Sequence, residues 1–368
     1  MADINFLRGS AEPTRRCRKL SIRDQLLVHY QPIVDLRSGE VLGVEALARI
    51  ADNDRIIFPG EFLPKLSSGA RRGMLFAVLA QGLAVLARYN TIRPDLTLSI
   101  NVDSSVMLHE DFASRITQTI GIYGVDPQRI ELEILEGGEF LCLDTARRQV
   151  QELKAQGLSV ALDDIGSAYS SLMRLKALPV DAIKLDQAFV RGLTEAPDDL
   201  RFVSAVTCLA RGLGKRLVVE GVETPEILDA MRVMGVEAAQ GYAIARPMSA
   251  EKLSEWLAEY VPVPASRKPA SLLGAYASHL SVLEACRALL NQPLKSTWLD
   301  DATDPHECDI GRYFEENHLH DTPFGIAHKE FHAALPYYES DRGWFNRATA
   351  QMQQTLSEAI RNGVSRLS

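Results

Sequence analysis

Residues 160–172 read VALDDIGSAYSSL, an apolar stretch that ends on two adjacent aspartates, Asp163 and Asp164. The apolar residues before the pair predict a buried β-strand, and the small residues after it predict a loop. Two like charges at the end of a buried strand repel each other and lose hydration, unless a cation or a proton compensates them. The rest of the chain indicates which compensation applies.

Between residues 26 and 250, short apolar runs alternate with longer segments whose apolar residues recur at spacings of three and four. The clearest helical segments are residues 72–89 and 144–157. The runs that read as strands are residues 26–36, 41–50, 96–102, 130–135, 159–164, 182–186, 216–222 and 240–245. This alternation predicts an α/β fold, a TIM-like (β/α)₈ barrel. A doubly wound open sheet is the alternative, but no glycine-rich phosphate loop of the GxGxxG or GxxxxGK type favours it.

Polar residues recur at the ends of these predicted strands. The set is Glu45, Asn101, Glu133, Asp163, Asp164, Lys184, Asp186, Glu220 and Gln240. In a parallel barrel the C-terminal strand ends converge on one mouth, where such enzymes carry their sites. Any single acid could be a solvated strand end, but the recurrence strand after strand favours a common site.

Crowded carboxylates need counter-charge, and hard divalent cations with oxygen ligands, Mg²⁺ or Mn²⁺, are the natural compensation. Asp163 beside Asp164 allows one carboxylate to bridge two ions while its neighbour holds the second. Two such ions form a clamp for phosphoester displacement, and Lys184 could orient the attacking water. Zinc is less favoured at these acids because no His or Cys accompanies them.

The tripeptide Glu45-Ala46-Leu47 followed by Arg49 resembles the signature of EAL domains, the cyclic di-GMP phosphodiesterases. Similar motifs recur in HYQPIVDLRSGEVLGV (29–44), INVDSS (100–105), ELEILE (131–136), ALDDIGSAYSSLMRLKALPVDAIKLDQAFV (161–190), VVEGVET (218–224) and QGYAIARP (240–247). The similarity covers roughly residues 26–258. It implies a TIM-like barrel with one reversed strand, and metal-dependent hydrolysis of cyclic di-GMP to linear 5′-pGpG.

The resemblance also implies roles for individual residues. Two Mg²⁺ or Mn²⁺ ions would be held by Glu45, Asn101, Glu133, Asp163, Asp164 and Glu220, with Asp163 shared between them. Lys184 would hydrogen-bond the nucleophilic water, and Glu223 would steady the loop after Asp164. The catalytic set is therefore Glu45, Lys184, Glu220 and Glu223, and the nucleotide contacts are Gln31, Leu47, Arg49, Asp186 and Gln240.

Three positions depart from the family pattern. Ile165 stands where an aromatic residue is usual, Ala168 where glycine is usual, and Leu135 where threonine is usual. Glycine often serves where φ is positive, so Ala168 could reshape the loop that couples the metals to dimerisation in this family. The inferred ligands are complete, which favours an active enzyme. The alternative is a receptor that binds cyclic di-GMP without hydrolysis and signals through its C-terminal helices.

The stretch VPVPASRKPA (261–270) reads as a linker, and six of the eight histidines lie beyond it. We therefore expect an N-terminal segment without a recognisable motif (1–25), a barrel (26–260), the linker (261–270) and a helical domain (271–368).

The C-terminal region offers soft ligands at helical spacing. His328 and His332 are four residues apart and share a helix face. His279 lies in an apolar seam, and Cys308 lies between His279 and His328 in the sequence. The order of these residues resembles the chemoreceptor zinc-binding domain, a small helical bundle with three His ligands and one Cys ligand. The matching residues are His279, Cys308, Gly311, Tyr313, His328 and His332. Tyr313 stands where tryptophan is common, and a metal-free helical bundle is the alternative.

Bulk properties narrow the class of partner. The net charge is −8, which argues against binding to nucleic-acid polymers. We see no apolar run of about 18 residues and expect no membrane span. The five scattered cysteines fit reduced thiols in a cytoplasm. The apolar seam of the C-terminal helices favours a homodimer.

Overall fold

The computed structural model describes residues 25–52, 55–135, 143–165, 171–266, 268–289, 304–338 and 340–363. It divides into two compact units. The first unit comprises residues 1–34, 41–186 and 245–262, and the second comprises residues 35–40, 187–244 and 263–368.

A parallel sheet with one reversed strand forms the centre of the first unit. Strands β2, β4, β5, β6 and β7 are parallel neighbours in that order, and β1 pairs antiparallel with β2. The reversed strand that the family resemblance implies is thus β1. The strands are β1 (Leu26–Asp35), β2 (Val41–Asp52), β4 (Thr97–Val102), β5 (Ile130–Ile134), β6 (Ser159–Ile165) and β7 (Ala182–Leu185), with a short β3 (Arg55–Ile57) antiparallel to β2.

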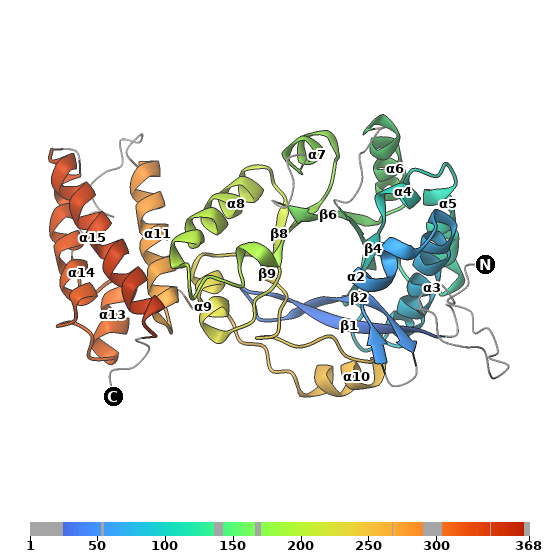
Figure 1. The fold of residues 1–368 in the computed structure, drawn as a ribbon, viewed down its shortest axis with the longest axis horizontal. Helices are drawn as coiled ribbons and strands as arrows, with labels where there is room; N and C mark the ends of the chain where they lie inside the picture. The colour runs from blue at the N-terminus through green and yellow to red at the C-terminus, as the bar shows by residue number, and fades with distance from the viewer. Residues whose placement is uncertain are drawn as a thin grey trace, which may run out of the picture. The chain divides into compact units, whose positions relative to one another are not determined.

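Helices connect the parallel strands of this unit (Figure 1). The long ones are α3 (Ser68–Ala87), α5 (Phe112–Ile122), α6 (Leu143–Ala155), α7 (Ser171–Ala177) and α10 (Ala250–Glu259). Shorter pieces are α2 (Pro59–Phe62), η2 (Leu63–Lys65), α4 (Ser104–Met107) and η3 (Pro127–Arg129). The predicted helical segments 72–89 and 144–157 correspond to α3 and α6.

Helix α3 is long and apolar enough, by length and composition alone, to cross a membrane. One face of the helix is nevertheless buried in the fold, because Leu79, Leu83 and Leu86 are buried and the helix packs against β2 and β4. Gly82 lies so close to Leu98 of β4 that a β-carbon there would come within 2.7 Å of the leucine side chain. This packing is typical of a core helix in a folded domain.

The second unit contains two parallel strands and two groups of helices. Strand β8 (Arg216–Val219) pairs with β9 (Ala238–Ala239), flanked by α8 (Leu200–Gly212) and α9 (Pro225–Val233). Short 3₁₀ turns are η4 (Gln187–Phe189), η5 (Pro197–Asp199) and η6 (Leu335–Tyr337). The C-terminal helices, orange to red in Figure 1, are α11 (Leu272–Leu289), α13 (Asp309–Glu316), α14 (Pro323–Ala334) and α15 (Arg342–Arg361).

The prediction of a strand over residues 240–245 is wrong, because β9 ends at Ala239. The reason is the backbone pairing of the following residues. Gly241 lies against the backbone of Val222, where a β-carbon would come within 2.1 Å of the carbonyl oxygen. The Val222 amide donates to the carbonyl of Gln240, and its carbonyl accepts from Ala243, so these groups form a turn instead of a strand ladder.

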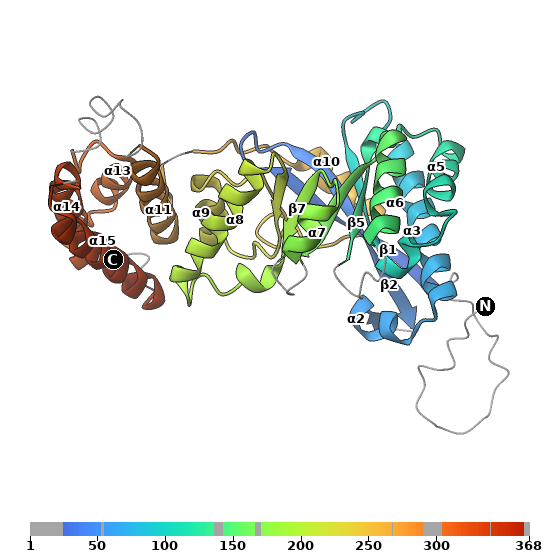
Figure 2. The same cartoon turned by 90° about the horizontal axis from the view of Figure 1, so that it is seen from above.

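Helix α11 packs along α9, and both views of the fold show the two helices side by side (Figures 1 and 2). At the contact, Gly274 of α11 lies against the carboxylate of Asp229 on α9. That carboxylate accepts hydrogen bonds from the Ala270 amide at 2.9 Å and from the Ser271 hydroxyl at 2.7 Å. Part of the predicted linker is therefore fixed to α9 by hydrogen bonds.

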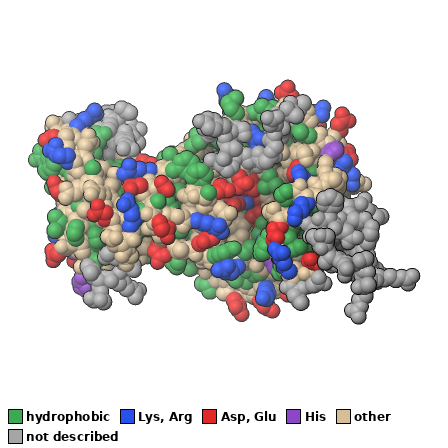
Figure 3. Space-filling view, in the orientation of Figure 1, with side chains coloured by type: hydrophobic (Ala, Val, Ile, Leu, Met, Phe, Trp, Pro, Cys, Tyr) green, Lys and Arg blue, Asp and Glu red, His purple; other side chains and the backbone are tan. Residues whose placement is uncertain are grey.

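Charged side chains of both signs are interspersed on the face of the molecule drawn in Figure 3. Lys and Arg lie among Asp and Glu over the coloured part of that face, and no large basic patch is visible there. A surface that binds nucleic acid non-specifically gathers its basic side chains into a patch or stripe.

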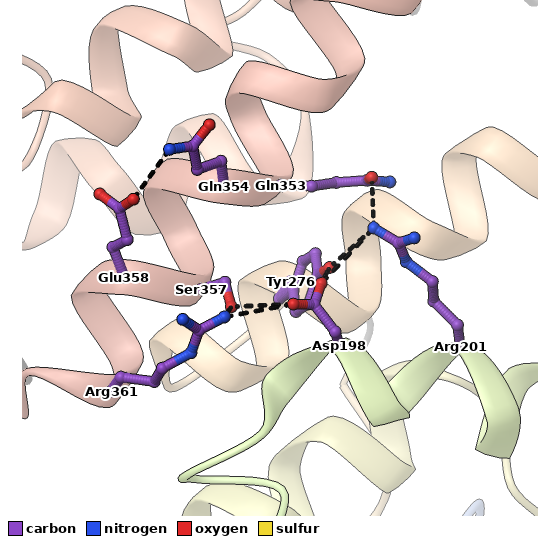
Figure 4. A network of polar contacts seen from close by, with 8 residues as sticks. All are labelled: Asp198, Arg201, Tyr276, Gln353, Gln354, Ser357, Glu358 and Arg361. Carbon is purple, nitrogen blue, oxygen red and sulfur yellow. Dashed lines mark hydrogen bonds and ion pairs between the residues drawn. The ribbon is translucent and has the colours of Figure 1, made fainter.

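A polar network centred on Asp198 connects η5 with helices α11 and α15 (Figure 4). Asp198 accepts from the Tyr276 hydroxyl at 2.6 Å and pairs with Arg361 at 3.2 Å. Tyr276 is fully buried, and burial, followed by the bond to Asp198, raises its pKa to about 12. Arg201 extends the network to Gln353 on α15 at 2.7 Å.

Removing the centre of this network should loosen the attachment of α15. We predict that Asp198→Ala costs about 2 kcal/mol, because the buried Tyr276 hydroxyl loses the carboxylate that it donates to. Hydrogen exchange of the α15 amides should accelerate, and the unfolding midpoint should fall. The matched control is Asp199→Ala, an exposed neighbour outside the network. Equal exchange rates in the two variants would contradict the assignment.

Candidate active site

The strand β2 presents three predicted site residues on one face. Glu45, Leu47 and Arg49 alternate along the strand, so their side chains point the same way. Gln31 of β1 lies directly opposite Glu45 in the antiparallel ladder and therefore shares that face. Gln31 donates to the carbonyl of Ala245 at 3.0 Å, and the Arg49 guanidinium lies 4.9 Å from the centre of the Phe58 ring.

A lysine surrounded by carboxylates lies at the centre of the site. The Lys184 ammonium nitrogen is 2.8 Å from Glu133, 3.3 Å from Glu45 and 3.7 Å from Asp163. All four side chains are buried, and Lys184 is only 1% exposed. Three carboxylates thus face one ammonium group, so the cluster has an excess of negative charge when its acids are ionised.

Three of the buried side-chain oxygens without a hydrogen-bond donor belong to predicted site residues of the first unit. They are Oδ1 of Asn101, Oε1 of Glu133 and Oδ1 of Asp163. The side-chain NH₂ of Asn101 donates to Glu45, so the side-chain oxygen of Asn101 points away from Glu45. Asn101 and Glu133 are direct partners in the β4–β5 ladder, so both point to the same face. Oxygens of this kind are the ligands that Mg²⁺ and Mn²⁺ prefer, and the residues present fit such ions.

The protonation of the acids reflects the same crowding. Burial, followed by the charge of Glu45, raises the pKa of Glu133 well above its usual value, and Lys184 offsets this only in part. Burial likewise raises the pKa of Asp163, with Lys184 acting in the opposite direction. A divalent ion would favour the ionised forms of both.

A local irregularity explains how both adjacent aspartates can serve one site. Successive side chains of a regular strand point to opposite faces. The pairing of β6 with β7 is interrupted between Leu162 and Ile165, and Asp164 has a φ of +57°. Ligand oxygens of Asp163 and Asp164 thereby lie within 4.8 Å of one another. Bulges of this kind re-aim side chains next to active sites, and aspartate tolerates the left-handed region better than most residues.

The remaining predicted residues of the barrel occupy strand ends. Asp186 directly follows β7 in the first unit. In the second unit, Glu220 and Gln240 directly follow the parallel neighbours β8 and β9. Glu223 forms an ion pair with Arg191 at 2.7 Å. The loop that leads from the end of β8 to Glu223 turns at Gly221, which has a φ of +69°. The loop residues 166–170, Ala168 among them, lie outside the described residues.

Sequence reasoning missed Glu131, a buried acid two residues before Glu133 on the same strand. Its carboxylate accepts from Ser159 at 3.0 Å and from Ser99 at 3.4 Å, one layer below the lysine cluster. The signal was the alternation of acids in IELEI, which places both glutamates on one strand face.

The C-terminal helices bring three of the four predicted soft ligands together. Ligand atoms of Cys308, His328 and His332 lie within 4.8 Å of one another. The Cys308 sulfur is 3.2 Å from Nε2 of His328, which in turn is 3.0 Å from Nε2 of His332. His279 is fully buried with no partner at either ring nitrogen, and its ring contacts Phe331 edge-on at 4.6 Å.

Two of the three buried imidazoles of this group have lowered pKa values, which favours their neutral forms near pH 7. Burial lowers the pKa of His279 to about 3 and that of His328 to about 2. Burial also raises the pKa of the Cys308 thiol, although the amides of Gly311 and Ile310 act in the opposite direction. Neutral imidazoles and a thiol that a metal can deprotonate fit a zinc ion.

Comparison with known proteins places the barrel in a family. A family model described as "EAL domain" matches residues 14–247 of the chain. A cyclic di-GMP phosphodiesterase of Pseudomonas aeruginosa is 36% identical over 230 residues, which are 62% of this chain and 39% of that protein. MucR of the same organism, a bifunctional diguanylate cyclase and cyclic di-GMP phosphodiesterase, is 31% identical over 237 residues, which are 63% of this chain and 34% of that one.

Solved structures support the fold. The MucR phosphodiesterase in complex with cyclic di-GMP has a TM-score of 0.59 at 31% identity, covering 63% of this chain and 95% of that one. The EAL domain of DcpA from Mycobacterium smegmatis has a TM-score of 0.56 at 32% identity, covering 64% of this chain and all of that one. The chain therefore has the TIM-like barrel fold with additional C-terminal helices. It spans only about two fifths or less of the length of the curated relatives named above.

The raised pKa of Glu133 predicts a stability cost at neutral pH. The folded chain keeps a proton on Glu133 above pH values where the unfolded chain has lost it, so its contribution to stability falls as pH rises past about 4.5. In chelator at about pH 8, Glu133→Gln should raise the melting temperature, because the substitution removes the cost of ionising a buried acid. The gain should shrink towards pH 5. Glu40→Gln, on an exposed turn, is the control, and a lower melting temperature for Glu133→Gln at pH 8 would contradict this.

Proposed function

Because the chain belongs to the EAL domain family, we propose that it hydrolyses one phosphodiester of cyclic di-GMP to give linear 5′-pGpG. The observation that carries the proposal is the buried cluster of Glu45, Glu133 and Asp163 around Lys184, with donor-free oxygens on Asn101, Glu133 and Asp163. A receptor needs no such excess of buried acids to bind a dianionic ligand, because those acids repel phosphate.

The oxygens of this cluster would hold two Mg²⁺ or Mn²⁺ ions, with Glu220 and Asp164 completing the set that the family implies. Such ions would supply an activated water and would neutralise charge on the phosphodiester. Lys184 donates hydrogen bonds to Glu45 and Glu133. In the active site that the family implies, this ammonium group would also orient the attacking water. Gln31, Leu47 and Arg49 would contact the nucleotide from the face of β1 and β2 that Glu45 shares.

The zinc-binding bundle would regulate this activity. The group Cys308, His328 and His332 would bind zinc, with His279 of α11 as the fourth ligand. Helix α11 also packs on α9, and α9 begins two residues after Glu223. A shift of α11 on zinc release would therefore reach the loop that carries Glu220 and Glu223. A homodimer and a cytoplasmic location belong to the same proposal, the location supported by the free thiols of Cys208 and Cys308. The apolar seam of α11 is buried within the chain, so a dimer would use another surface.

The hydrolase proposal predicts formation of pGpG from cyclic di-GMP in Mg²⁺ or Mn²⁺, measured by chromatography. Glu45→Gln should lower turnover at least about 100-fold, since changes even outside the ligand shell of metal sites cost 10–100-fold. Glu40→Gln, an exposed acid before the same strand, should retain full activity. Binding of cyclic di-GMP by the wild-type chain without product would instead support the receptor.

The zinc proposal predicts one tightly bound zinc per chain that Cys308→Ser and His332→Asn weaken strongly. Metal analysis of the full chain measures the zinc content, and a thiol-reactive dye measures whether zinc protects the Cys308 thiol. The matched control is Cys208→Ser, an exposed thiol that donates to Glu284 at 3.3 Å outside the bundle core. Turnover that stays constant after verified zinc removal would refute the regulatory part while leaving zinc binding intact.

A further inference from the structure

A second group of potential ligands lies on the C-terminal bundle, apart from the cysteine-containing one. Ligand atoms of His306, Glu315 and His320 all lie within 4.8 Å of one another. The two imidazole rings are 5.0 Å apart between centroids. His306 and Glu315 are exposed and His320 is half-buried, whereas His328 and His332 are buried.

The segment that carries His306 is held in place by its surroundings. The His306 amide donates to the side chain of Asp304 at 2.8 Å. Gly311 on α13 lies directly beneath this turn, and a β-carbon there would come within 1.8 Å of the Pro305 carbonyl and 3.1 Å of the His306 Cα. The close approach fixes the distance from His306 to α13, the helix that carries Glu315.

The turn that carries His320 is held equally firmly. The Leu319 amide donates to the carbonyl of Phe314 at 2.8 Å, and the Thr322 hydroxyl donates to the carbonyl of Leu319 at 2.6 Å. A β-carbon on Gly325 would come within 2.6 Å of the His320 carbonyl, so this glycine lets the turn rest on α14. Both histidines are therefore positioned by the backbone, before any ligand binds.

Two features of the group favour a cation between its side chains. Nε2 of His320 is buried and has no hydrogen-bond partner. Glu315 lies in the last turn of α13, where the helix dipole disfavours a negative charge, and no Lys or Arg lies in that turn. Among the described residues, Glu315 forms no ion pair with Lys or Arg, whereas its neighbour Glu316 pairs with Lys268.

We propose that His306, Glu315 and His320 form a second metal site, which takes an exchangeable divalent transition-metal ion. Two imidazoles and one carboxylate suit Zn²⁺, Ni²⁺ or Fe²⁺ and do not suit Mg²⁺, which prefers oxygen ligands. Three protein ligands leave coordination positions for water, and the exposure of the group lets the ion exchange with solvent. The site stands independently of zinc at Cys308.

The test is a calorimetric titration of the untagged full chain with Ni²⁺, after loading with a single equivalent of zinc, which the buried cysteine-containing group takes first, and in excess Mg²⁺ to fill oxygen-ligand sites. Wild-type protein should bind one further Ni²⁺ per chain. His306→Asn and His320→Asn should each weaken this binding at least about tenfold, and Glu315→Gln should weaken it as well.

Two controls make the outcome specific. His318→Asn changes an exposed histidine of the same turn outside the group, at a φ of +55° that asparagine tolerates, and should keep the extra Ni²⁺. Cys308→Ser should also keep it, because the buried group is separate. Equal Ni²⁺ binding by wild type, His306→Asn and His320→Asn would overturn the proposal, as would loss of binding in Cys308→Ser alone.

Discussion

The buried ammonium of Lys184 is the interaction on which the site depends. Lys184 is on β7, and the three carboxylates around it come from β2, β5 and β6. Its charge therefore links β7 to each of these three strands near the strand ends. When all three acids are ionised, one lysine does not balance them, and nearby oxygens of Asn101, Glu133 and Asp163 accept no hydrogen bond. Such a cluster suits the divalent cations that we propose for it, and without them its crowded acids lower the stability of the folded chain.

Much of the barrel could be predicted from the sequence because its strands are buried on both faces and read as apolar runs. Such runs locate strands well, as β1, β2 and β4 to β8 demonstrate. The failure at residues 240–245 arose from a tertiary constraint, since the backbone of Gly241 meets that of Val222 far away in sequence. An apolar pattern carries no information about such an approach.

The candidate site was likewise predictable in part from the sequence, and in part it depends on the folded structure. The candidate site residues were predicted from the acids at strand ends, and the ladder pairing of Asn101 with Glu133 places these two side chains on one face of the sheet. The close approach of Asp163 and Asp164 depends on a bulge and a positive φ, which a regular two-residue period does not predict. On the bundle, the pair His328 and His332 was visible as a four-residue spacing. His306 and His320 come from two turns, and only the folded chain brings them together.

The packing of α11 on α9 limits which substitutions the chain tolerates at their contact. The contact at Gly274 leaves no room for a side chain, because a β-carbon there would come within 1.9 Å of the Asp229 carboxylate. A single methyl group would act as a wedge between the helices and would also disturb the acceptor of Ser271. Substitutions at Gly274 of α11 and at Asp229 of α9 are therefore coupled, because a larger side chain at position 274 requires a change at position 229.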